Sequence, residues 1–267
     1  MKGDAVVFTV SWPGMIATLD KEASELPGMP GEYWYQSRRP LSSLFFVLPL
    51  LAFYEGGVLW LGPEGVRNGA DLWMQRLLGF LGFGGFLLLP VLTVSILLAW
   101  HHTSRQPWRV SRNVLFGMAA ESSALAALLL VVADLQARVL EVCGVAVPCQ
   151  IADGVFATGF FPNMIRYFGA GIYEELLFRL ILVPVTIAAI GLLIAARHVK
   201  VAGALFLTSF VFAAAHYVGP QGDACEMYSF VFRFVAGGFF AVLFVFRGFG
   251  IAVGTHALYD VLVSVSQ

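Results

Sequence analysis

Long apolar stretches recur along the chain and are separated by short polar segments. A bilayer core of about 30 Å is crossed by a helix of roughly 20 apolar residues. Stretches of this kind fall at residues 41–61, 78–100, 113–133, 163–196, 201–218, 227–246 and 249–265. They are apolar on every side rather than along one stripe, which is typical of helices surrounded by lipid. The pattern predicts an all-α polytopic transmembrane helix bundle of about seven spans.

The segment 163–196 is longer than the others and contains Pro184. As one straight helix it would be roughly 50 Å long at about 1.5 Å per residue, which exceeds the thickness of the bilayer core. Proline removes a backbone hydrogen bond and bends or breaks a helix. We therefore expect a kink at Pro184 or a second short helix, and the second case would give eight spans.

The ends of the spans indicate domain organisation and orientation. Residues 1–40 form a polar N-terminal tail, and residues 41–267 form a single transmembrane domain. Basic side chains occupy two loops, before the third and fifth spans: Arg105, Arg109, Arg112, Arg197 and Lys200. Because cytoplasmic loops are the basic ones, both loops are expected on the cytoplasmic side. With seven spans this places the N-terminus in the cytoplasm.

Composition agrees with a membrane protein and excludes several classes. The chain is 59% hydrophobic and 12% charged, whereas soluble domains are about 25% charged. A net charge of -1 provides no basic field for nucleic acid. The three cysteines are too few for a disulfide framework or a Cys-ligated zinc site. Cys143 and Cys149 share a predicted external loop, and whether they pair is open.

One predicted span contains two carboxylates and a guanidinium. Ionisable groups at bilayer depth cost roughly 2.5–3.5 kcal/mol each, so those that are present are candidates for function. Glu175 and Arg179 are four residues apart and share a helix face, which favours an ion pair. Glu174 lies about 140° around the helix from Arg179 and is left without a local partner. An unpaired buried carboxylate can serve as a general base.

Two later spans contain further polar pairs. Phe212 and His216 are four residues apart, as are His256 and Asp260. Asp260 can fix the tautomer of His256 or favour its charged form. Taken singly, a buried histidine is usually a hydrogen-bonded core residue, and a Glu/Arg pair is often structural. Together, on three of the last four spans of a chain so poor in charge, these groups indicate a shared polar cavity.

In this order the motifs resemble those of the CAAX prenyl endopeptidase and bacteriocin-processing family, the CPBP or Abi intramembrane proteases. The family pattern is E-E-x-x-x-R, F-x-x-x-H and H-x-x-x-N or H-x-x-x-D, each on its own helix. It is matched here by Glu174, Glu175 and Arg179, by Phe212 and His216, and by His256 and Asp260. The resemblance covers residues 160–267, where it implies the catalytic core. It implies an intramembrane endopeptidase that acts on a membrane-anchored or lipid-modified protein or peptide.

The resemblance also implies roles by motif position. Glu174 is expected to activate the attacking water and His216 to help hold it. His256 and Asp260 are expected to stabilise the tetrahedral oxyanion, with Glu175 and Arg179 as a structural ion pair. Because many members have Asn at the position of Asp260, and an ionised carboxylate cannot donate a hydrogen bond, Asp260 is assigned the role of orienting or charging His256.

Metal dependence is open at this stage. We favour a mechanism without a cofactor, because the helical zinc motif H-E-x-x-H does not occur in the sequence. The alternative is a catalytic zinc ion with Glu174, His216 and His256 as ligands.

Two other functions fit the same residues. One is a non-catalytic scaffold or immunity-type protein of the same family that binds a peptide. The other is a proton-coupled transporter with a Glu/His relay. Filled catalytic positions favour the enzyme, and the lack of a detectable inverted repeat argues against the transporter. The sequence leaves open the substrate, the accessible membrane face, the oligomeric state and the roles of Glu55, Glu121 and Arg233.

Overall fold

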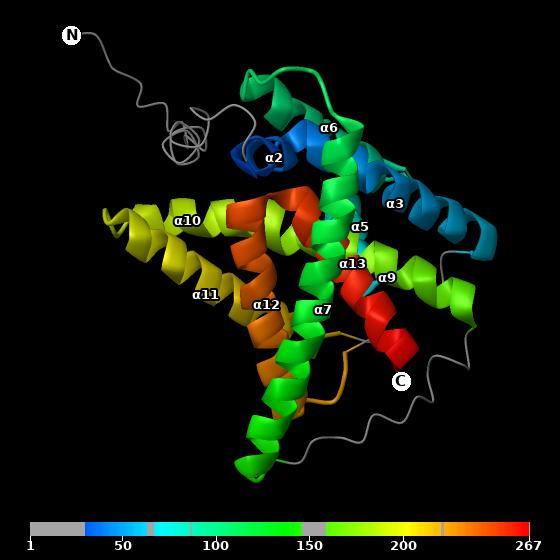
Figure 1. Ribbon diagram of the computed structural model, residues 1–267. Helices are drawn as coiled ribbons and strands as arrows, with labels where there is room; N and C mark the ends of the chain where they lie inside the picture. The colour runs from blue at the N-terminus through cyan, green and yellow to red at the C-terminus, as the bar shows by residue number, and fades with distance from the viewer. Residues whose placement is uncertain (1–29, 63–66, 86, 146–158, 220–221, 267) are drawn as a thin grey trace.

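The computed structural model describes residues 30–62, 67–85, 87–145, 159–219 and 222–266, and these contain helices and turns but no strand (Figure 1). The helices are α2 (Pro30–Ser37), α3 (Pro40–Leu61), α5 (Gly69–Phe80), α6 (Leu88–Thr103), α7 (Arg112–Val142), α9 (Phe160–Glu174), η1 (Glu175–Leu182), α10 (Val183–Gly191), α11 (Arg197–Ala215), α12 (Met227–Arg247) and α13 (Phe249–Ser266). The predicted all-α class is confirmed. Cys149, and with it the question of a disulfide to Cys143, lies outside the described residues.

Four of these helices, α3, α7, α11 and α12, are long and apolar enough to cross a membrane. α6 and α13 are shorter apolar helices. The protein is therefore an integral membrane protein with a helical transmembrane domain. The total of seven or eight spans and the cytoplasmic N-terminus remain predictions.

The predicted second span, residues 78–100, is wrong as a single helix. α5 ends at Phe80 and α6 begins at Leu88. Gly82 adopts φ +85°, the backbone of Gly82 donates to Gly79, and that of Phe83 donates to Leu78. This is a Schellman motif, which requires a left-handed residue and ends a helix. Hydrophobicity alone did not reveal the break, because most residues around the glycines are apolar.

The long predicted segment is one helical run of three parts, α9, η1 and α10. The expected disturbance at Pro184 begins nine residues earlier, because the chain widens into the π-helix η1 at Glu175. Pro184 then lies in the first turn of α10. In a π-helix the backbone hydrogen bonds join residue i to residue i+5 instead of i+4. The bonding pattern therefore changes before the chain reaches Pro184, which has no N–H to donate. Such turns often coincide with functional sites.

α13 lies at the centre of the bundle, packed against α7 on one side and α9 on another (Figure 1). Gly171 of α9 makes the second approach possible. A Cβ atom at this position would lie 2.8 Å from the Cβ atom of Ala257 and 2.9 Å from its backbone nitrogen. Since Gly171 is one turn before Glu174 and Ala257 follows His256, this close packing brings the first and third motifs together.

Residues 30–37 of the predicted tail form α2, which is fixed to the bundle through Glu121. Tyr33 donates to Glu121 at 2.6 Å, and Arg247 of α12 forms an ion pair with the same carboxylate at 2.5 Å. The Arg247 guanidinium also lies 3.6 Å from the centre of the Trp34 ring. Burial, together with the bond to Glu121, raises the pKa of Tyr33 above its ordinary value. Glu121 thus joins α2, α7 and α12.

Candidate active site

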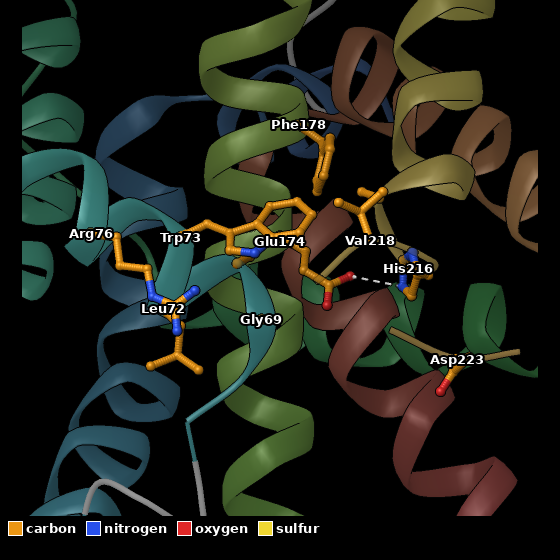
Figure 2. Close-up of a pocket in the computed structure, with 11 residues that line it drawn as sticks. Gly69, Leu72, Trp73, Arg76, Glu174, Phe178, His216, Val218 and Asp223 are labelled. Carbon is orange, nitrogen blue, oxygen red and sulfur yellow. Dashed lines mark ion pairs between the residues drawn. The ribbon is translucent and has the colours of Figure 1, made fainter. Parts of the chain in front are cut away.

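The three motifs converge on one carboxylate oxygen. Oε2 of Glu174 lies 3.8 Å from Nε2 of His216 and 3.8 Å from Nε2 of His256. Glu174 ends α9, His216 follows the last residue of α11, and His256 lies in α13. The side chains of Glu174 and His216 are 14% and 26% exposed, so water can reach them, whereas His256 is 7% exposed. Figure 2 shows the Glu174 carboxylate directed at His216.

One hydrogen bond of His216 shows which of its two ring nitrogens carries the proton and which has the free lone pair. Nδ1 lies 2.8 Å from the backbone oxygen of Phe212. A carbonyl oxygen only accepts hydrogen bonds, so Nδ1 carries the proton, and in the neutral ring Nε2 is an acceptor. The Phe212 ring packs edge-on against the imidazole at 4.8 Å between centroids. The F-x-x-x-H spacing therefore fixes both the tautomer and the orientation of His216.

His256 is oriented by Glu175 rather than by Asp260. Oε1 of Glu175 lies 2.7 Å from Nδ1 of His256. Oδ2 of Asp260 is 3.8 Å from Nε2, which is an ion-pair distance but too long for a hydrogen bond. The Phe240 ring stacks on the imidazole with centroids 4.5 Å apart. Glu175, predicted only as half of a structural pair, thus also contacts the candidate site.

Glu175 and Arg179 form an ion pair within η1, with 3.1 Å between Oε1 of Glu175 and Nη1 of Arg179. Both side chains are almost fully buried. Arg179 also donates to the backbone oxygen of Gly237 at 3.2 Å, and its guanidinium lies 4.2 Å from the centre of the Phe212 ring. The two adjacent carboxylates therefore have different environments: Glu174 faces the open side, and Glu175 is enclosed by its partners.

Glu174 and His216 line a cavity of about 190 Å³. Its other walls come from Phe178, Ala215, Val218, Asp223 and one face of α5, namely Gly69, Ala70, Leu72, Trp73 and Arg76. The sequence analysis missed α5, because its residues were divided between a loop and the predicted span 78–100. A signal was present: Asn68 caps the helix by accepting from the backbone nitrogen of Asp71 at 2.8 Å, and Asn is a preferred residue at this position.

A buried polar cluster joins α5 to α3 and lies beside Tyr173 of α9. Asp71 accepts from Tyr54 of α3 at 2.6 Å and pairs with Arg67 at 2.8 Å. Tyr173 of α9 donates to Glu55 at 2.5 Å, and the Tyr54 and Tyr173 rings pack edge-on with centroids 5.5 Å apart. Glu55, which had no predicted role, is therefore the partner of the residue that precedes Glu174.

Arg233, also without a predicted role, pairs with Asp223 at the edge of the cavity. The backbone nitrogen of Asp223 donates to the carbonyl oxygen of His216 at 2.9 Å. The Arg233 guanidinium lies 5.0 Å from the centre of the Tyr217 ring. Arg233 thus ties the chain that follows His216 to α12.

The three alternative zinc ligands, Glu174, His216 and His256, do come together. Within the described ranges, however, no group of three His, Cys, Asp or Glu side chains has the arrangement of a metal-ligand set. The donor atoms lie at ion-pair distances from one another. Nδ1 of each histidine is engaged, with Phe212 or with Glu175, and both Nε2 atoms face Glu174. The mechanism without a cofactor remains a prediction.

Comparison with known proteins gives one match. Residues 157–262 match the family model described as type II CAAX prenyl endopeptidase, Rce1-like. This segment contains all three motifs and thus confirms the resemblance seen in the sequence. No curated protein and no solved structure matches the chain.

Proposed function

We propose that this protein is an intramembrane endopeptidase in which Glu174 activates water. The starting point is that residues 157–262 match the family model of Rce1-like type II CAAX prenyl endopeptidases. The family and the membrane-capable helices support an enzyme of the CAAX protease type in the bilayer. The observation that carries the proposed mechanism is the position of one Glu174 oxygen, 3.8 Å from Nε2 of both histidines.

We place the attacking water between Glu174 and His216. A water oxygen about 2.8 Å from each of two acceptors spans a separation of this size. Nε2 of His216 and Oε2 of Glu174 are such acceptors, 3.8 Å apart. A water there donates one hydrogen to each and directs an oxygen lone pair into the cavity. In the proposal Glu174 takes the proton that is released on attack, and His216 holds the water through Nε2 while its Nδ1 stays bonded to Phe212.

The proposed hydrolysis has two stages, the attack of water and the breaking of the C–N bond. Water attacks the scissile carbonyl carbon, and its proton passes to Glu174. The carbonyl oxygen becomes an oxyanion, which Nε2 of His256 stabilises in the imidazolium form, while Nδ1 stays bonded to Glu175. The C–N bond then breaks and Glu174 returns the proton to the leaving amine. The products are a new C-terminal carboxylate and a new amino terminus. Asp260, at 3.8 Å, supports the charge on His256.

The substrate we propose is a prenylated or otherwise membrane-anchored protein or peptide. The family description supports the prenyl class, and exposed apolar side chains on the spans support a site beside lipid. The test is cleavage of a set of prenylated peptides by purified protein in liposomes, with products identified by mass spectrometry. We expect cleavage at one peptide bond. Binding without cleavage of any peptide would instead support the scaffold, and peptide-independent proton uptake would support the transporter.

We expect the active protein to contain no stoichiometric zinc. Elemental analysis of protein that cleaves the prenylated peptide checks this directly, with a chelator-treated sample assayed in parallel. Activity that survives chelation, with far less than one zinc per chain, agrees with the Glu174 mechanism. One zinc per chain, together with activity that is lost on chelation and restored by zinc, contradicts it.

A further inference from the structure

One face of α5 forms a wall of the cavity, and none of its residues has a role in the proposed catalytic steps. Gly69, Leu72, Trp73 and Arg76 line the cavity, and their spacing of three, four and seven residues places them on a single helix face. Leu77 and Phe80, outside this set, are 58% and 89% exposed. In the view of Figure 2, Trp73 lies between Arg76 and the Glu174 carboxylate. Arg76 therefore belongs to the cavity that holds Glu174.

Arg76 differs from the other charged groups of the cavity in having no counterion among the described residues. Among the described residues, Asp223 is paired with Arg233, and Glu174 faces two histidines. Arg76 makes no ion pair and no side-chain hydrogen bond with any residue that the structure describes, and its side chain is exposed. A guanidinium presents several donors in a plane that matches a carboxylate. The cavity thus contains a cationic group that is available to an anionic ligand.

α5 is held in place, so the backbone that carries Arg76 has a fixed position. Asp71, on the opposite face of the helix, is fully buried and accepts from Tyr54, Arg67 and Gln75. Tyr54 belongs to α3, which packs against α9, the helix that ends in Glu174. This chain of contacts fixes the wall that carries Arg76 relative to the proposed base.

We propose that Arg76 is a specificity-determining residue that binds a carboxylate of the substrate, close to the bond that is cleaved. The inference rests on the proposed function and adds a substrate class to it. The cavity of about 190 Å³ has the volume of roughly six water molecules, and an extended chain advances at most about 3.6 Å per residue. The carboxylate is therefore within a few residues of the scissile bond. It belongs either to the C-terminus of the peptide or to an acidic side chain near it.

The test measures binding in the Glu174→Gln background, which holds substrate without the proposed base. Three fluorescent prenylated peptides of otherwise equal sequence serve as probes, in neutral liposomes and again in liposomes that contain an anionic phospholipid. The first has a free C-terminal carboxylate, the second a C-terminal amide, and the third a C-terminal amide with one aspartate nearby. We expect at least one carboxylate-bearing peptide to bind about tenfold more tightly than the neutral amide. The peptide that keeps this advantage identifies the source of the carboxylate.

Adding Arg76→Gln is expected to abolish the advantage and to leave binding of the neutral amide unchanged. Arg109→Gln, at an exposed position in the loop before α7, changes net charge equally and is expected to keep the advantage. Equal binding of all three peptides, no binding at all, or an advantage that survives Arg76→Gln contradicts the proposal. Binding that depends on anionic lipid instead of peptide charge also contradicts it, because Arg76 would then hold a lipid phosphate. Failure of the wild-type protein to cleave counts against the proposed function alone.

Discussion

The Glu174→Gln variant is expected to cleave its peptide substrate at least about a hundredfold more slowly than the wild type, because general acid–base catalysis contributes about 10²–10⁴-fold. An amide cannot take up the proton of the attacking water, although it fills the same volume. The fold should be retained, since Glu174 is partly exposed and its carboxylate lies 3.8 Å from the two histidine nitrogens, too far for a hydrogen bond. The effect should therefore fall on the turnover rate and leave substrate binding nearly unchanged.

The measurement is the rate of product formation by purified Glu174→Gln and wild-type proteins at equal concentration in the same liposomes. Glu141→Gln, an exposed carboxylate near the end of α7, is the matched control and should retain the wild-type rate. Thermal unfolding of each protein shows whether a lost activity is a lost fold. A properly folded Glu174→Gln protein that cleaves at the wild-type rate would rule out Glu174 as the general base.

The Arg179→Ala variant is expected to lose about 3–5 kcal/mol of stability, the usual cost of removing one member of a buried ion pair. Glu175 would remain fully buried without its cationic partner. The contact between the guanidinium and the Phe212 ring would also be lost. Because η1 connects α9 to α10 and Glu175 orients His256, the loss should lower expression as well as the unfolding temperature.

Unfolding of detergent-solubilised protein by heat or denaturant checks this prediction. Arg138→Ala is the matched control, because Arg138 also pairs with a carboxylate four residues away, Asp134, but both side chains are largely exposed. Exposed pairs contribute little to stability, so the control should unfold like the wild type. Equal stability of the two variants would mean that the Glu175–Arg179 pair does not stabilise the fold.

The sequence predicted the helical class and brought together the residues that the structure places around Glu174. This succeeded because charge is scarce in the spans and because spacing within one helix can be read locally. The same reasoning assigned Glu175 to Arg179, a partner four residues away. It did not find that Glu175 also binds His256, because that contact joins η1 to α13 across the bundle. Asp260 was assigned to orient or charge His256 from its four-residue spacing and from its motif position in the family that the sequence resembles.

Other features depended on tertiary structure and were therefore not predicted. The partners of Glu121 and Glu55 are Arg247 and Tyr173, each more than a hundred residues away along the chain. α5 was not predicted, because the residues between α5 and α6 are mostly glycine and apolar residues, and hydrophobicity alone does not show where one helix ends. The sequence therefore gave no role to Trp73 and Arg76, which line the cavity.

The central claim is that Glu174 activates a water molecule for peptide-bond hydrolysis in the membrane. The most direct test is cleavage of a prenylated peptide in water enriched in heavy oxygen, by the wild-type and Glu174→Gln proteins in the same liposomes. We expect the wild type to release an N-terminal product with heavy oxygen in its new carboxylate, and the variant to release almost none. Equal amounts of labelled product from both proteins would contradict the claim.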